Sequence, residues 1–132
     1  KLGLKENVHL IGKLDHKTEL PKHYHNADIY LMTSINEPDG EFEGFGMVYT
    51  EAQCSGTPCI YSSESGSFDA VGEGGLMTKA RNPEDIAEKI LMLLKNENLR
   101  RELGKKAIEN AKKLSWDNLA KSYMKHYEEA LK

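Results

Sequence analysis

The sequence predicts an α/β protein, with an open parallel sheet in the first 80 residues and helices in the remainder. Two observations predict this class. Short apolar runs alternate with helical patterns as far as residue 80, an arrangement typical of parallel strands joined by helices. From residue 81 onward these runs stop, and apolar residues recur at helical spacing instead. We therefore expect one domain over residues 1–132, with a sheet part at 1–80 and C-terminal helices at 81–132.

Three elements are expected before the first long loop. The apolar run Val8–Ile11, followed by Gly12, predicts a buried strand that ends in a tight turn. A short helix is expected over Pro21–Asn26, because proline suits the first turn of a helix. The run Asp28–Met32 predicts the second strand.

The middle of the chain predicts one helix and two further strands. A helix is expected over Gly46–Ser55, and Gly56 is a suitable residue to end it. Pro58–Tyr61 predicts the third strand, and Gly75–Met77 predicts a short fourth one. These elements complete the expected sheet.

The last 50 residues predict three helices. Asn82 is expected to cap the first of them and Pro83 to take its first position, with acidic residues in the first turn. Ser115 can cap the last helix. The expected apolar stripes are Ile86, Ile90, Leu93 and Leu94 on the first helix, Leu99, Leu103, Ala107, Ala111 and Leu114 on the second, and Trp116, Leu119, Tyr123 and Tyr127 on the third.

Composition excludes several classes of protein. No apolar run approaches the roughly 20 residues that a membrane span needs, and no signal-peptide core begins the chain. A net charge of −3 argues against sequence-independent binding to nucleic acid. Two cysteines do not make a disulfide framework, so we expect a reducing, cytoplasmic setting. The charge is uneven, with a net of −7 over residues 1–97 and +4 over residues 98–132; the basic end suits a solvated helix face or an anionic contact.

A glycine-rich loop precedes the helix predicted at residue 46. Gly40, Gly44 and Gly46 lie between the second strand and this helix. In an open α/β sheet, ligands bind at the carboxyl ends of the strands, where such loops lie. Glycines let the backbone approach a ligand, and the free amides of Phe45–Val48 at the helix start suit a phosphate. The loop is therefore a candidate phosphate site, with a chance turn as the alternative.

Two carboxylates flank this helix start. Glu43 lies in the loop, and Glu51 falls in the early turns of the helix. Carboxylates accept paired hydrogen bonds from neighbouring hydroxyls, so the pair suits sugar or ribose recognition. A chain this rich in glutamate also contains such pairs by chance, so the spacing alone does not decide the role.

The run EGFGMVYTEAQCSGTPCI resembles the signature of retaining glycosyltransferases of family four, which share the two-domain GT-B architecture. That signature is a glutamate, Phe-Gly, an apolar pair, Glu-Ala, a small-residue stretch, and Gly-x-Pro. The resemblance continues in order through LGLKENVHLIG, ELPKHYHNADIYLMTS, the loop 66–71, NPEDIAEKI and LSWDNLAKSYMKHYEEAL. It implies a Rossmann-like open parallel sheet, the C-terminal half of a GT-B architecture. Residues 1–132 would then be part of a nucleotide-sugar-binding domain.

The resemblance also implies roles for the motif residues. It gives Glu43 the catalytic position, in contact with donor-sugar hydroxyls near the reacting centre, and gives Glu51 the nucleotide ribose. It places Val48 beside the diphosphate. The loop whose backbone amides meet the sugar is Gly44, Phe45, Gly46 and Met47. From the residues alone, core packing is the alternative for Phe45 and Met47, and a solvent-exposed helix position is the alternative for Glu51.

One segment departs from the family pattern. The family runs from the preceding strand almost directly into the motif, whereas this chain inserts the acidic segment 36–42. Together with Glu43, its carboxylates could bind Mg²⁺ or Ca²⁺, which prefer oxygen ligands. The spacing matches no standard calcium loop, and the fold type works without a bound metal. We expect no metal and no separate cofactor, and the insertion leaves the presentation of Glu43 open.

The histidines and cysteines, as candidate metal ligands, do not have the spacing of a metal site. His23 and His25 are two residues apart, so they do not face one another on a helix. Cys54 and Cys59 lack the paired spacing of a zinc site and are more typical of small core residues.

The resemblance further implies that parts of the enzyme lie outside these residues. They are an N-terminal acceptor domain and the first two strands of the donor domain, with the Arg and Lys that neutralise the diphosphate. In the family's sheet these strands lie between the first and second strands expected here. Either those two strands pair directly, or another copy fills the gap, or the 132 residues are a piece of a longer protein. We expect the last of these, and we expect the 132 residues alone to be inactive.

The expected function is donor binding in a retaining hexosyltransferase, which moves a hexosyl group from a nucleoside-diphosphate sugar to a hydroxyl acceptor. A non-catalytic sugar-nucleotide-binding module and a GT-B-type sugar-nucleotide epimerase are the alternatives. The expected partners are the sugar nucleotide and the acceptor domain, and no nucleic acid. The expected location is the cytoplasm, including the inner face of the membrane if the acceptor domain contacts lipid.

Overall fold

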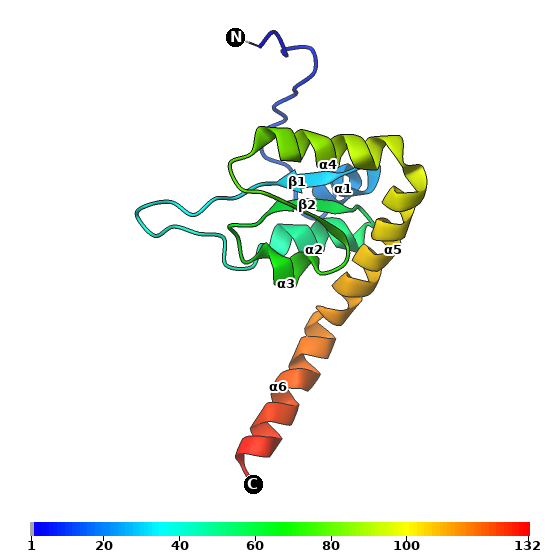
Figure 1. Cartoon of the computed structure of the whole chain (residues 1–132). Coiled ribbons are helices and arrows are strands. Elements are labelled where there is room, and N and C mark those ends of the chain that lie inside the picture. The colour runs from blue at the N-terminus through cyan, green and yellow to red at the C-terminus, as the bar shows by residue number, and fades with distance from the viewer. Residues whose placement is uncertain (1) are drawn as a thin grey trace.

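The computed structural model describes residues 2–132, and strands and helices alternate along the chain as far as the last strand (Figure 1). The elements are α1 (Leu20–Asn26), β1 (Tyr30–Met32), α2 (Met47–Cys54), β2 (Cys59–Ser62), α3 (Ser67–Val71), β3 (Gly75–Thr78), α4 (Pro83–Lys95), α5 (Glu97–Lys113) and α6 (Trp116–Ala130). This order confirms the predicted α/β class.

The sheet formed by the described residues has three parallel strands in the order β1–β2–β3. Cys59 of β2 stands opposite Tyr30 of β1 on one side and Gly75 of β3 on the other. Parallel neighbours need a crossover, and α2 and α3 supply the two crossovers. Every residue of β2 is buried, because the central strand has helices on both of its faces.

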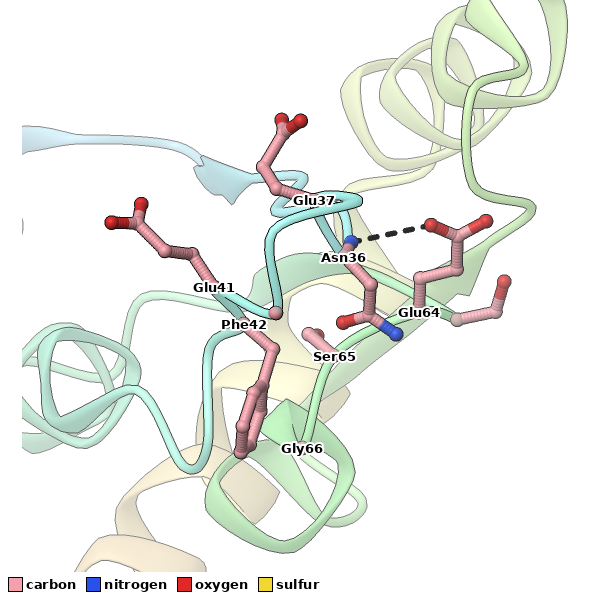
Figure 2. Close-up of a pocket in the computed structure, with 9 residues that line it drawn as sticks. Asn36, Glu37, Glu41, Phe42, Glu64, Ser65 and Gly66 are labelled. Atoms are coloured by element: carbon pink, nitrogen blue, oxygen red, sulfur yellow. Dashed lines mark hydrogen bonds between the residues drawn. The ribbon is translucent and has the colours of Figure 1, made fainter.

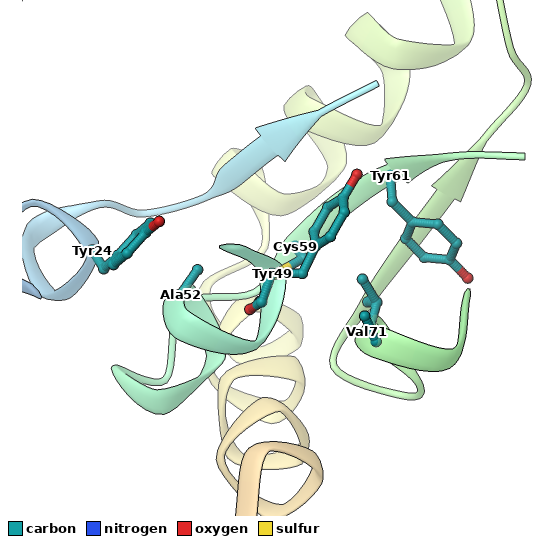
Figure 3. Packing of buried hydrophobic residues seen from close by; sticks show 7 residues of the cluster. Tyr24, Tyr49, Ala52, Cys59, Tyr61 and Val71 are labelled. Atoms are coloured by element: carbon teal, nitrogen blue, oxygen red, sulfur yellow. Dashed lines mark hydrogen bonds between the residues drawn. The ribbon is translucent and has the colours of Figure 1, made fainter. Parts of the chain in front are cut away.

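One face of the sheet carries an aromatic core beneath α1, α2 and α3 (Figure 3). Tyr49 of α2 is fully buried, and its ring meets Tyr30 and Tyr61 edge-on, with centroids 5.5 and 6.4 Å apart. The Tyr49 hydroxyl donates to the backbone carbonyl of Met32. Edge-to-face packing of this kind adds stability beyond the burial of the rings, so it fixes α2 against the strands.

The opposite face carries an aliphatic core beneath α4. Ile60 points to this face because successive residues of a strand alternate between the two sides. It packs with Leu93 of α4 and Leu103 of α5. Figure 1 shows α4 on the side of the sheet away from α2 and α3. The two clusters together make the layered core.

A close backbone contact joins α5 to the end of α2. A Cβ at Gly104 would lie 2.5 Å from the carbonyl oxygen of Gly56, so only glycine allows this approach. Gly56 itself has a φ of 76°, the left-handed conformation expected of a residue that ends a helix. The prediction that Gly56 ends the helix is confirmed.

The helix-start predictions are confirmed for α1 and α4. Proline takes the first turn of both helices. Asn82 caps α4, because its side-chain oxygen accepts a hydrogen bond of 2.9 Å from the backbone N–H of Asp85. Ser115 stands at the N-cap of α6 as predicted, although its side chain makes no capping hydrogen bond.

The predicted strand Val8–Ile11 is wrong. These residues have no regular secondary structure and are exposed, with Leu10 97% accessible. A strand needs a neighbour for its backbone hydrogen bonds, and no described strand pairs with this segment. The predicted loop 66–71 also proves to contain a helix, α3.

The last helix forms but does not join the core. It continues beyond α5 and leads away from the sheet (Figure 1), and none of its residues is buried. Its apolar stripe, including Trp116, Tyr123 and Tyr127, stays exposed. Among residues 2–132, no helix is both long and apolar enough to cross a membrane.

Candidate functional site

The glycine-rich loop lies beyond the carboxyl end of β1 and leads directly into α2. Gly46 is the residue before the helix and has a φ of 81°. A Cβ there would lie 2.6 Å from the ring of Tyr49, so both the left-handed backbone and the buried ring require glycine. The first turn of α2 is therefore fixed to the aromatic core, and this turn, in which backbone amides lack partners within the helix, follows directly after the glycine-rich loop.

The loop after β2 holds the motif loop in place. The backbone N–H of Gly66 donates to the carbonyl of Glu43 over 2.8 Å. A Cβ at Gly66 would lie 1.9 Å from the carbonyl oxygen of Gly44. The two loops therefore meet backbone to backbone, at the carboxyl ends of neighbouring strands.

An open cavity of about 590 Å³ lies between the acidic insertion 36–42 and the loop after β2 (Figure 2). Its walls come from the acidic insertion and from the loop after β2. The lining residues are Asn36, Glu37, Gly40, Glu41, Phe42, Ser63, Glu64, Ser65 and Gly66. The cavity thus adjoins the motif loop on the side of the insertion.

The insertion is tied at its base to Glu64 and Arg81. The backbone N–H of Asn36 donates to Glu64 over 3.3 Å, and the Arg81 guanidinium donates to the Asn36 carbonyl over 2.9 Å. Arg81 also pairs with Glu64 at 3.6 Å, and it is a non-glycine residue with a positive φ, 57°. This exposed pair contributes little energy but fixes where the insertion leaves the sheet.

The acidic side chains of the insertion do not converge. Figure 2 shows the carboxylates of Glu37 and Glu41 pointing in different directions, away from Glu64. Across residues 2–132, no three His, Cys, Asp or Glu side chains come together as a metal site would require. Cys54 is exposed, whereas Cys59 is buried, and both are free.

The predicted site residues lie on one continuous segment at the start of α2. Phe45 and Met47 are 37% and 61% exposed, so core packing is wrong for both side chains. Glu43 and Glu51 are partly buried. The ligand roles of Glu43, Gly44, Phe45, Gly46, Met47, Val48 and Glu51 stay predictions.

Glu51 contacts a residue that the sequence did not single out. The Tyr24 hydroxyl, on α1, donates to the Glu51 carboxylate over 3.2 Å. Burial, followed by the charge of Glu51, raises the pKa of Tyr24 to about 12. Arg81 was missed for the same reason as Tyr24, since each meets the site through the fold. The loop 66–71, which begins with Gly66, was singled out in the sequence by its resemblance to the family.

The buried aromatic core predicts a loss of stability at alkaline pH. Burial raises the pKa of the Cys59 thiol to about 12, and it also raises the pKa values of Tyr24 and Tyr30. The unfolded chain therefore loses these protons first, from about pH 9 to 10 upward. The stabilisation is complete below that range and is lost as the pH rises toward 12. Between the unfolded-state and folded-state pKa values of a group, the folded chain keeps a proton that the unfolded chain has lost. In that range each group lowers the free energy of unfolding by about 1.4 kcal/mol per pH unit.

Urea unfolding at pH 8, 9, 10 and 11 measures this dependence. The Cys59→Ala variant is expected to show a shallower decline than the parent chain, because one titrating group is gone. A free energy of unfolding that stays constant from pH 9 to 11 would contradict the effect of burial.

Known proteins are similar to this chain in sequence and in fold. Residues 1–112 match the family described as "Glycosyl transferases group 1". A D-inositol 3-phosphate glycosyltransferase from Corynebacterium glutamicum is 32% identical over 133 residues, which cover 99% of this chain and 30% of the relative. The chain thus spans less than a third of that relative's length.

Two solved structures have a similar fold. Sucrose-phosphate synthase from Thermosynechococcus elongatus matches with a TM-score of 0.78 and 27% identity, over 97% of this chain and 31% of that one. HepE from Anabaena, in complex with UDP, matches with a TM-score of 0.68 and 19% identity, over 88% of this chain and 31% of that one. Both similarities confirm the predicted Rossmann-like α/β fold class. Since the family match spans most of its length, the chain belongs to the group 1 glycosyl transferases.

Proposed function

We propose that this chain is the donor-binding part of a retaining glycosyltransferase that transfers a hexosyl group from a nucleoside-diphosphate sugar to a hydroxyl acceptor. The observation that carries the proposal is the meeting of the motif loop, the start of α2 and the loop after β2 at one end of the sheet. Group 1 membership supports transfer over the alternatives of a binding module or an epimerase. The neighbour crystallised with UDP supports a nucleotide ligand.

Each motif residue receives a role in this proposal. The carboxylate of Glu51 holds the ribose hydroxyls, and Glu43 contacts the hydroxyls of the donor sugar near the reacting carbon. The amides of Gly44–Met47 meet the sugar, and Val48 lies beside the diphosphate. Charge grows on the diphosphate as the bond to the sugar breaks, and fixed amide dipoles at the helix start stabilise that charge without rearranging.

The acceptor is bound outside these residues in this proposal. The chain spans less than a third of its relative, so there is room in such a protein for an acceptor domain and for further strands of the donor domain. Lipid contact, if the protein makes it, belongs to the acceptor domain, and the protein acts in the cytoplasm. The donor site needs no separate cofactor and no metal.

Replacing Glu51 with alanine in the full-length protein tests the ribose role. The nucleotide loses hydrogen bonds to a charged acceptor, each worth about 1.5–3 kcal/mol, so we expect affinity to fall about 10- to 100-fold. Isothermal titration with UDP, GDP and ADP measures this and names the base. Glu128→Ala removes an exposed glutamate of α6 as the control. Equal affinity in the two variants would refute the role of Glu51.

A further inference from the structure

The Glu51 carboxylate accepts a hydrogen bond from a tyrosine on a different helix. The hydroxyl of Tyr24 donates to Oε2 of Glu51 over 3.2 Å, and 27 residues separate the two positions. We propose that Tyr24 is a positioning residue, which orients the Glu51 carboxylate to receive a pair of ribose hydroxyls. This inference rests on the proposed function, and it adds a residue that lies outside the glycosyltransferase motif.

Tyr24 is itself firmly held. Its backbone carbonyl accepts a hydrogen bond of 2.6 Å from the hydroxyl of Thr57, which is buried just before β2. Its ring packs edge-on against Tyr30, with centroids 5.6 Å apart and an interplanar angle of 74°. Only 9% of Tyr24 is exposed. The backbone and ring of Tyr24 are therefore held in place, so its hydroxyl can orient a neighbouring side chain.

The hydrogen bond also has a fixed direction. Because the pKa of Tyr24 is about 12, its hydroxyl stays protonated at neutral pH and remains a donor. A carboxylate offers about four acceptor sites on two oxygens. The tyrosine occupies one site on Oε2, and Oε1 and the remaining lone pairs stay available to a diol.

The expected gain in nucleotide affinity comes from preorganisation of the Glu51 side chain. A glutamate side chain has three rotatable bonds, and ordering such a side chain on binding weakens affinity. Holding the carboxylate before the nucleotide arrives removes part of that loss, which corresponds to about a 3- to 10-fold gain in affinity. Tyr24 acts through Glu51 and does not itself touch the ligand.

A double-mutant cycle in the full-length protein tests the proposal. Tyr24→Phe keeps the ring and removes only the hydroxyl. Tyr30→Phe is the matched control, because it removes the neighbouring hydroxyl, whose contact is the sulfur of Met32 at 3.7 Å. Each change is made alone and together with Glu51→Ala. Affinity for UDP, GDP and ADP is measured by isothermal titration, and the melting temperature is measured alongside.

The expected result is a coupling that depends on Glu51. Tyr24→Phe should weaken binding of the preferred nucleotide about 3- to 10-fold in the parent protein and not at all in the Glu51→Ala protein. Tyr30→Phe should leave affinity unchanged in both. A merely structural tyrosine would weaken binding equally in the two backgrounds, and that outcome would overturn the proposal.

The remaining outcomes separate this inference from the proposed function. If Glu51→Ala weakens binding and Tyr24→Phe does not, the positioning role fails and the donor site stands. If Glu51→Ala itself has no effect, the ribose role fails and the positioning role fails with it. If Tyr24→Phe does not fold, the hydroxyl serves the fold, and the positioning role is overturned.

Discussion

Replacing Gly66 with alanine is expected to weaken nucleoside-diphosphate binding by the full-length protein about 100-fold. A Cβ at this position would lie 1.9 Å from the carbonyl oxygen and 2.7 Å from the carbonyl carbon of Gly44, and 3.2 Å from the carbonyl oxygen of Glu43. All three atoms belong to the backbone, so no side-chain rotation relieves the contact. The φ of Gly66, −70°, is one that alanine adopts freely. The effect therefore comes from the contact between the two loops.

The loops must separate to admit the methyl group, and the motif loop moves with Glu43. The amides of the motif loop and helix start, which are proposed to meet the donor, move as well. Losing hydrogen bonds to a charged group costs about 1.5–3 kcal/mol each, so the loss of two weakens binding on the order of 100-fold. Overpacking is also expected to lower the free energy of unfolding by about 1–3 kcal/mol. Titration with UDP, GDP and ADP measures binding, and urea unfolding measures stability. The control is Asn98→Ala in the exposed first turn of α5. Parent-like affinity in Gly66→Ala would show that this loop contact does not position the donor site.

Leu93→Ala is expected to lower the free energy of unfolding by about 2–5 kcal/mol. Leu93 is fully buried, and it joins α4 to Ile60 of the central strand and to Leu103 of α5. Truncation removes buried apolar surface and leaves a cavity where three elements meet. Since the free energy of unfolding of a domain is only about 5–15 kcal/mol, this single change removes a large part of the stability of the fold.

A leucine on the same helix supplies the control for this measurement. Leu91 is 50% exposed, and Leu91→Ala is expected to change the free energy of unfolding by less than about 1 kcal/mol. Both variants change the same chemistry in the same helix, so urea unfolding compares burial alone. Equal losses in the two variants would contradict the placement of the aliphatic core.

Local signals in the sequence predicted most of the helices and all three strands of the described sheet. The Asn82-Pro83 start predicted α4, and Gly56 predicted the end of α2. These predictions were possible because a cap or a helix-ending glycine acts on backbone groups within one turn. The apolar runs that became β1, β2 and β3 likewise carry their own composition.

The predictions that failed concern residues whose structure depends on distant partners. Val8–Ile11 has the composition of a strand, but pairing requires a neighbour that the described residues do not supply. The stripe of α6 has helical spacing, which predicted the helix correctly, yet spacing does not determine what the helix packs against. Secondary structure in these two segments was therefore decided differently, since a helix satisfies its own backbone and a strand does not.

The residues of the candidate site likewise fall into those that the sequence indicates and those that only the fold brings to the site. The segment from Glu43 to Glu51 could be singled out as a candidate site because its residues are contiguous and match a family motif. The loop that begins at Gly66 could be singled out by the same resemblance. Tyr24 and Arg81 could not, because each meets the site only after the chain has folded. No spacing along the chain predicts the contact between Gly66 and Gly44, which depends on β1 and β2 being neighbours in the sheet.

The sequence by itself therefore determined the α/β class, the capped helices, the central strands and the family to which the chain belongs. Its information is local, held in periodicity, capping residues and one contiguous motif. The tertiary structure alone decided that segment 8–11 pairs with no strand among the described residues, that α6 leaves the core, and that Tyr24 meets Glu51. Those outcomes depend on which surfaces meet across long stretches of chain, where pairing and burial are settled by the fold as a whole.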